Sequence, residues 1–187
     1  CLQQAFMLIM DTATLPPPRK PIQKVLIANR GEIARRVIRT CKKLGINTVA
    51  IYSTSDTNGV YVREADEAVF IGASEARESY LCIDKIIKIA KDLKVDAIHP
   101  GYGFLSENAD FSAACKQSGI VFIGPSAESI LSMGSKSMSK KLLKEKAPSI
   151  PLIPGYNGTD QSDAILIEQA KSIGFPVLLK ASAGGGG

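Results

Sequence analysis

The last residues of the chain combine a lysine with a run of glycines, a combination that could hold phosphates. Residues 176–180 read Pro-Val-Leu-Leu-Lys, which predicts a strand ending at Lys180, and Ala183 precedes four glycines at 184–187. The backbone N–H groups of a glycine-rich loop and a lysine ammonium suit the phosphates of a nucleoside triphosphate. The alternative is a flexible linker, but the apolar strand and its lysine favour the phosphate site.

The most distinctive stretch is His-Pro-Gly-Tyr-Gly-Phe-Leu-Ser-Glu-Asn at residues 99–108, directly after a predicted strand. Open α/β sheets place ligands at the carboxyl ends of their strands. The two glycines would let backbone approach a ligand, Tyr102 offers a ring face and a hydroxyl, and Glu107 supplies a carboxylate. The alternative is a capped turn with two conformational glycines. His99 taken alone is more typical of a hydrogen-bonded core residue than of a catalyst.

The turn at residues 29–34 argues against a dinucleotide. It reads Asn-Arg-Gly-Glu-Ile-Ala, with one glycine where the dinucleotide fingerprint needs three. Arg30 and Glu32 would stand where bare backbone should meet the pyrophosphate. The chain also lacks a Gly-x-x-x-x-Gly-Lys-Ser/Thr loop, so we expect no NAD site.

The net charge of +5 is concentrated in one segment: residues 136–146 contain five lysines and one acid, Glu145. Such a cluster could be a solvated helix face, a nucleic-acid patch or a surface that faces phosphates. Because no nucleic-acid motif accompanies it and aromatic residues make up only 6% of the chain, a small phosphate-bearing molecule is the better candidate partner.

The cysteines and the apolar segments exclude other classes. The four cysteines at 1, 41, 82 and 115 form no Cys-x-x-Cys pair, and the single histidine cannot complete a zinc set. We therefore expect a reducing compartment, with Cys41 and Cys115 buried in helices. The apolar run at residues 5–10 is too short to span a membrane.

Alternating strands and helices must position these residues. Short apolar runs predict five strands, and amphipathic patterns predict helices between them, the first ending at Gly45. This alternation indicates an α/β fold with a Rossmann-like parallel sheet, complete by about Met133. The predicted strands are 24–28, 48–52, 68–71, 97–99 and 120–123, and the predicted helices are 33–44, 83–93 and 109–117. Prolines then mark a junction before a helix at 163–172.

Five of these stretches together resemble the successive signatures of biotin carboxylases, in that family's order. They are residues 25–34, 97–108, 122–125, 133–136 and 179–187. Two positions depart from the family pattern: Ser135 stands where an acid is usual, and Ala183 where glycine is frequent. Neither change removes a group that the chemistry needs.

The resemblance implies that ATP phosphorylates bicarbonate to carboxyphosphate, which delivers carbon dioxide to biotin carried on a protein domain. It implies no catalytic residue and no metal ligand within this chain, because the Mg²⁺ or Mn²⁺ carboxylates, the bicarbonate-binding arginine and the general base belong to the continuation. It places ATP at Lys136, Lys180, Gly186 and Gly187, and the biotin side at Tyr102, Gly103 and Glu107.

The resemblance also implies an organisation and partners. We expect a disordered leader at residues 1–21, a biotin carboxylase N-terminal domain at 22–135, and the incomplete start of an ATP-grasp domain at 136–187. Since the chain opens on cysteine and ends on bare glycines, we expect a fragment that is inactive alone. The implied partners are a biotin carboxyl carrier domain, a carboxyltransferase and a second copy of the chain, with neither nucleic acid nor membrane. Arg39 is either part of the contact between the two copies or a solvated arginine.

The final acyl acceptor is less closely defined. Residues 154–162 most resemble the biotin-carrying subunit of 3-methylcrotonyl-CoA carboxylases, which implies the mitochondrial matrix, with the cytoplasm as the alternative. Pyruvate, propionyl-CoA, acetyl-CoA and urea carboxylases remain open. A different class, a non-catalytic Rossmann-like module for dimerisation or scaffolding, also remains. Residues 99–107 argue against another ATP-grasp ligase that makes a carboxylated purine precursor or carbamoyl phosphate.

Overall fold

The computed structural model describes residues 21–134 and 136–179, and the side chains of residues 136–138 lie outside that description. Its centre is a parallel sheet of five strands in the order β3-β2-β1-β4-β5. The strands are β1 (Lys24–Ile27), β2 (Asn47–Ser53), β3 (Glu67–Gly72), β4 (Ala97–His99) and β5 (Val121–Phe122). The predicted Rossmann-like parallel sheet is therefore confirmed.

Helices cover both faces of the sheet, because the buried strands are apolar on both sides. On one face, Val25 and Ile27 of β1 pack with α2 (Gly31–Lys43) and α3 (Val60–Glu64). On the other face, Leu26 packs with α4 (Ile83–Asp92) and α5 (Ala109–Gln117). Successive side chains of β1 point to opposite faces of the sheet because a strand has a period of two residues. The core therefore has two layers, one on each face of the sheet.

The first helix ends as its sequence predicts. Ala34, Ile38 and Cys41 are buried on one face of α2, and Gly45 follows the helix with a φ of +69°. The N–H groups of Gly45 and Ile46 return to carbonyls of the last turn at 3.2 and 2.9 Å, as expected of a helix end with a left-handed glycine. Cys41 and Cys115 are both buried, as predicted.

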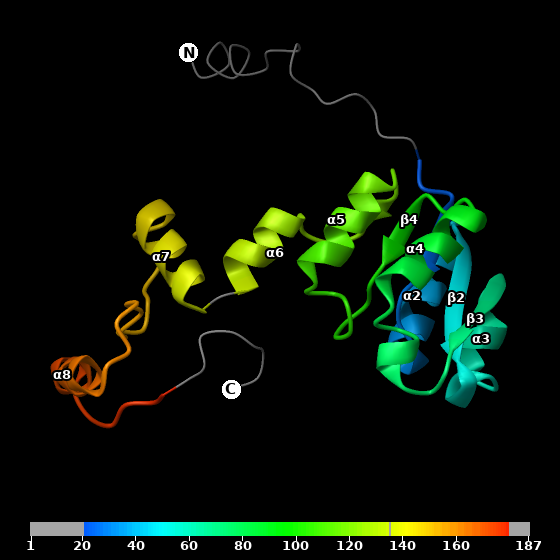
Figure 1. Ribbon diagram of the computed structural model, residues 1–187. Coiled ribbons are helices and arrows are strands. Elements are labelled where there is room, and N and C mark those ends of the chain that lie inside the picture. The colour runs from blue at the N-terminus through cyan, green and yellow to red at the C-terminus, as the bar shows by residue number, and fades with distance from the viewer. Residues whose placement is uncertain (1–20, 135, 180–187) are drawn as a thin grey trace, which may run out of the picture.

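Three further helices follow the sheet: α6 (Ala127–Gly134), α7 (Lys136–Lys146) and α8 (Asp163–Ile173). Figure 1 shows them following one another away from the strands. Two short 3₁₀ turns, Thr54–Asp56 and Ala76–Glu78, complete the regular structure. None of the helices in the described ranges is long and apolar enough to cross a membrane.

The predicted strand at residues 176–180 is wrong for the part that the structure describes. Residues 176–179 form no regular structure, and Leu178 and Leu179 are 78% and 85% exposed. A strand requires a neighbour to bond its backbone groups, and no strand within residues 21–134 and 136–179 pairs with this segment. The predicted leader at residues 1–21 falls almost entirely outside the described residues.

Candidate functional site

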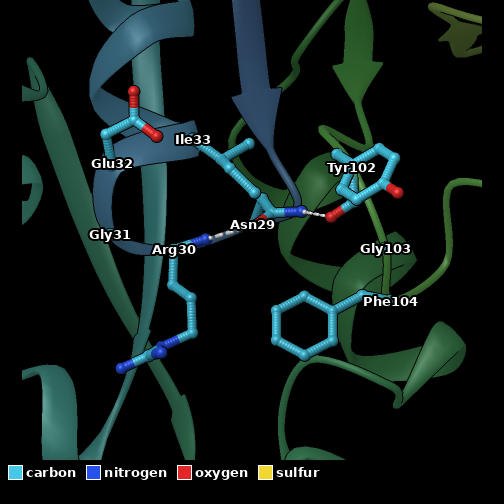
Figure 2. A pocket seen from close by; sticks show the side chains of 8 residues that line it. All are labelled: Asn29, Arg30, Gly31, Glu32, Ile33, Tyr102, Gly103 and Phe104. Atoms are coloured by element: carbon cyan, nitrogen blue, oxygen red, sulfur yellow. Dashed lines mark hydrogen bonds between the residues drawn. The ribbon is translucent and has the colours of Figure 1, made fainter.

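The two sequence stretches after β1 and β4 meet at the carboxyl edge of the sheet. The chain continues from β1 to β2 on one side, whereas β4 pairs with β1 on the other side, which makes this edge the switch point where open sheets bind ligands. An open pocket of about 410 Å³ lies there, and Figure 2 shows the side chains around it. It is lined by Asn29, Arg30, Gly31, Glu32, Ile33, Tyr102, Gly103 and Phe104.

Asn29 joins the two stretches. Its side-chain nitrogen donates to the carbonyl oxygens of Pro100 and Tyr102, both at 2.9 Å. Its side-chain oxygen accepts the Arg30 N–H at 2.9 Å. The residue is 1% exposed, so hydrogen bonds rather than water satisfy its amide, as a buried polar group requires.

The loop after β4 turns sharply, with positive φ angles at Gly101 (+69°), Gly103 (+72°) and Phe104 (+41°). A Cβ on Gly101 would lie 2.6 Å from the Asn29 side-chain nitrogen. Glycine is therefore required at 101 for two reasons: the backbone conformation and the close approach of Asn29. Tyr102, between the glycines, is 80% exposed at the pocket.

An ion pair fixes the other wall. Nε and Nη2 of Arg30 donate to the Asp56 carboxylate at 2.7 and 2.5 Å. Asp56 also accepts the Tyr80 hydroxyl at 2.5 Å and the Ser53 hydroxyl at 3.1 Å. The hydrogen bonds between Arg30 and Asp56 are the main reason why the pKa of Asp56 is held below its usual range and the pKa of Arg30 is raised. These bonds favour the charged form of each group.

Aromatic residues connect the hydrogen bonds of Asp56 to the loop that follows β4. The Tyr80 ring stacks on Phe104 with centroids 5.1 Å apart, and its hydroxyl lies 3.1 Å from that of Tyr61. Both tyrosines are buried, and desolvation is the main reason why their pKa values are raised. Neither hydroxyl is suited to act as a base near neutral pH, so we assign the pair a structural role.

The other predicted residues of this edge lie around the pocket rather than in it. His99 is half-buried, its Nδ1 accepts the Gly101 N–H at 3.0 Å, and burial lowers its pKa. Glu107 is exposed and is not among the lining residues. The start of α5 is capped by Asn108, whose side chain accepts the Phe111 N–H at 2.8 Å.

The predicted nucleotide-binding residues are not part of this geometry. Lys136 begins α7, but its side chain lies outside the description, and Lys180, Gly186 and Gly187 lie outside the described residues. Arg39 is exposed on α2. Among residues 21–134 and 136–179, no three His, Cys, Asp or Glu side chains form a set that could hold a metal ion.

Sequence reasoning missed Asn29, Arg30 and Phe104 as lining residues. The turn at 29–34 was interpreted as a failed dinucleotide fingerprint and as part of a biotin carboxylase signature, and neither interpretation assigned it to a pocket. The available signal was its position directly after the first strand of a parallel sheet, which places it at the ligand-binding edge whatever its side chains are.

Comparisons with known families agree with this arrangement. The model of the family "Biotin carboxylase, N-terminal domain" matches residues 21–130, and that of "Carbamoyl-phosphate synthase L chain, ATP binding domain" matches residues 136–187. The mitochondrial methylcrotonoyl-CoA carboxylase subunit alpha of Dictyostelium discoideum is 56% identical over 90% of this chain and 24% of its own length. Biotin carboxylase 2 of Bacillus subtilis is 54% identical over 88% of this chain and 36% of its own.

Solved structures show the same likeness. The biotin carboxylase domain of Hydrogenobacter thermophilus 2-oxoglutarate carboxylase, a dimer in complex with MgADP, ADP and bicarbonate, has a TM-score of 0.83 and 48% identity. A biotin carboxylase of Campylobacter jejuni, solved as a beta-gamma-ATP complex, has a TM-score of 0.84 and 44% identity. They cover 90% and 89% of this chain, and the chain covers 36% and 37% of theirs. It spans about a quarter of the methylcrotonoyl-CoA carboxylase subunits.

Proposed function

This chain belongs to the biotin carboxylase family, and from that premise we propose that it forms part of an ATP-dependent ligase that carboxylates protein-linked biotin with bicarbonate. The observation that carries the proposal is the match of two consecutive family regions, residues 21–130 and 136–187, in one chain. The relative from Hydrogenobacter thermophilus was solved with MgADP and bicarbonate, which are a product and a substrate of such a reaction. We place the boundary between the two domains near residue 135.

The roles of individual residues follow from the same proposal. Lys136 and Lys180 neutralise charge on the nucleotide, and the N–H groups of Gly186 and Gly187 lie over its phosphates. Phosphoryl transfer depends chiefly on such positioning and charge neutralisation. Magnesium would supply further neutralisation of the phosphates when bound, through ligands other than those of the described residues.

The switch-point pocket is the biotin side of the site. Tyr102 and Gly103 line it, and the exposed Tyr102 ring offers an apolar face to a small bicyclic ligand such as the biotin head group. Glu107 lies five residues beyond Tyr102 and does not line the pocket. We propose that it lies beside the path by which biotin reaches the pocket.

We propose 3-methylcrotonyl-CoA as the acyl acceptor and the mitochondrial matrix as the location, because the mitochondrial methylcrotonoyl-CoA carboxylase subunits of Dictyostelium discoideum and Mus musculus are 56% and 55% identical to the chain. Biotin carboxylase parts of pyruvate and 2-oxoglutarate carboxylases have the same fold at 49% and 48% identity, so the N-terminal domain itself does not select the acceptor. The partners are a biotin carboxyl carrier domain, a carboxyltransferase, and a second copy of the chain, with Arg39 at the dimer contact.

The test is ATP cleavage by the full-length protein that contains this chain, measured with and without bicarbonate and biotin. Lys180→Ala should lower kcat/KM for ATP on the order of a hundredfold, since a charged contact to a phosphate contributes a few kcal/mol to the transition state. Lys171→Ala, an exposed lysine on α8, is the control and should leave ATP use unchanged.

Two outcomes would contradict the proposal. If the folded, magnesium-loaded protein cleaves no ATP in the presence of biotin and bicarbonate, a non-catalytic module is the better interpretation. Equal losses of activity and melting temperature in Lys180→Ala would identify a structural lysine.

A further inference from the structure

We propose that Asn29 is a positioning residue that holds the loop at residues 100–104 in the conformation that receives biotin. The inference rests on the proposed function, because it takes Tyr102 and Gly103 as the biotin side. Asn29 itself need not touch the ligand. It acts through the backbone carbonyls of Pro100 and Tyr102, to which it is hydrogen-bonded across more than 70 residues of chain.

The geometry selects an asparagine. One planar nitrogen donates to two carbonyls, both at 2.9 Å, while the oxygen on the same carbon accepts the Arg30 N–H at 2.9 Å. An ionised aspartate has no donor for the carbonyls, and alanine has neither a donor nor an acceptor. Glutamine is one carbon longer, and the space ahead of Asn29 is already occupied by Gly101, whose added Cβ would lie 2.8 Å from the Asn29 side-chain carbons.

The loop needs such an anchor because its backbone is costly to hold. Three of its residues have positive φ angles, and one of them, Phe104, is not a glycine. Left-handed conformations of that kind persist only where surrounding contacts fix them. Two contacts fix the loop: the Asn29 amide bonds the carbonyls of Pro100 and Tyr102, and the Tyr80 ring stacks on Phe104.

Tyr102 and Gly103 are the residues of this fixed loop that line the pocket together with Phe104. Tyr102 is 80% exposed and Gly103 is exposed, whereas Leu105, just beyond Phe104, is buried. Figure 2 shows Asn29 between the two loops, with Arg30 on one side of the pocket and Phe104 on the other. Because the Asn29 side chain donates to the carbonyl of Tyr102 itself, replacing Asn29 removes a bond that holds Tyr102 directly.

The experiment compares Asn29→Ala with Thr48→Val in the full-length protein. Thr48 is also fully buried and hydrogen-bonded: its hydroxyl donates to Asp66 at 2.7 Å and accepts the Asp66 N–H at 3.1 Å. It lies near the start of β2, at the opposite edge of the sheet from the pocket. The readouts are kcat, the KM for free biotin, the KM for ATP, the melting temperature, and amide hydrogen exchange over residues 100–108.

Asn29→Ala should raise the KM for biotin roughly tenfold, the size expected from losing one to two net hydrogen bonds, and leave the KM for ATP unchanged. Amides at residues 100–104 should exchange faster. Thr48→Val should lower the melting temperature by about as much as Asn29→Ala does, but it should change neither the KM for biotin nor the KM for ATP. Asn29→Ser, which can keep the contact to the Arg30 N–H, is the milder variant if Asn29→Ala does not fold, and it should show the same selective rise.

The positioning role would be overturned if Asn29→Ala left the KM for biotin unchanged. It would also be overturned if Asn29→Ala and Thr48→Val each raised the KM for biotin and the KM for ATP together. Either result would leave the proposed ligase activity intact. Absence of biotin-dependent ATP cleavage in the unmodified protein would overturn the proposed function instead. In that case amide exchange over residues 100–108 would still show whether Asn29 holds the loop.

Discussion

Replacing Asp56 by asparagine keeps the shape of the side chain and removes the charge that organises one wall of the pocket. Asp56 is 7% exposed, and its carboxylate accepts two bonds from Arg30, one from Tyr80 and one from Ser53. Breaking a fully buried ion pair costs about 3–5 kcal/mol. The Arg30 side chain remains 47% exposed, so water stabilises its charge in the variant, and we expect a loss of about 2–3 kcal/mol in the free energy of unfolding.

The pH dependence has a definite sign. The folded state lowers the pKa of Asp56, so its contribution is complete above the unfolded value of about 3.9. The contribution is lost as pH falls through the lower, folded value. The difference in stability between the unmodified chain and Asp56→Asn should therefore be largest near neutral pH and shrink below about pH 4. Other carboxylates titrate in both proteins and cancel from this difference.

Urea unfolding of the two proteins, followed by circular dichroism at pH 7 and at several values between 5 and 3, measures both effects. The control is Asp92→Asn, which breaks the exposed pair between Lys88 and Asp92 on α4. That pair is solvated, and its loss should cost less than about 0.5 kcal/mol. The reasoning is refuted if the two substitutions cost the same, or if the loss caused by Asp56→Asn is constant across the pH range.

Two shorter tests bear on the glycines and the cysteines. Gly101→Ala should destabilise the chain by more than Gly45→Ala in urea unfolding, because both residues have a φ of +69° but only Gly101 faces a side chain within 4 Å; equal losses would mean that backbone strain alone matters. With Cys1 replaced by serine, Cys82 should react with a thiol reagent at pH 8 before Cys115, since Cys82 is half-buried and burial raises the pKa of Cys115 to about 11. Addition of urea should abolish that difference in rate, and a difference that persists in urea would show that folding does not cause it.

The sheet could be predicted from the sequence because its central strands are buried on both faces. Runs such as Val-Leu-Ile at residues 25–27 have no polar face, and their spacing with amphipathic helices implies parallel crossovers. The short helix α3 has no such signal, since five residues are too few to show a period. It is held by tertiary contacts instead, chiefly the fully buried Tyr61, whose hydroxyl donates to the Ile51 carbonyl at 3.2 Å.

The second part of the chain was harder to predict for a different reason. Helix α6 was not predicted from the sequence, although the Ser126 hydroxyl accepts the Ser129 N–H at 3.2 Å as a helix cap does. The strand expected at residues 176–180 was inferred from apolar content. Apolar content does not specify a partner strand, and without one the segment leaves Leu178 and Leu179 exposed.

The site shows the limit of local patterns most clearly. The loop at 99–108 was recognised from its own residues, but the bonds that shape it come from Asn29, about 70 positions earlier. A pattern that extends over a few residues contains no information about such a partner. The topology does, because parallel strands bring their carboxyl ends to one edge, and β1 and β4 are neighbours there.

The same edge explains why a Rossmann-like sheet here need not bind a dinucleotide. In the dinucleotide fold, glycines after the first strand leave the helix N-terminus open to pyrophosphate. In this chain Asn29 and Arg30 occupy that turn, and their side chains are bound to the neighbouring loop and to Asp56. The sheet then serves as a platform that fixes the loop carrying Tyr102, and phosphate binding has to be supplied elsewhere, for which we propose Lys136, Lys180 and the terminal glycines. Sheet topology therefore determines where a ligand binds, and the residues of the first turn determine which ligand that is.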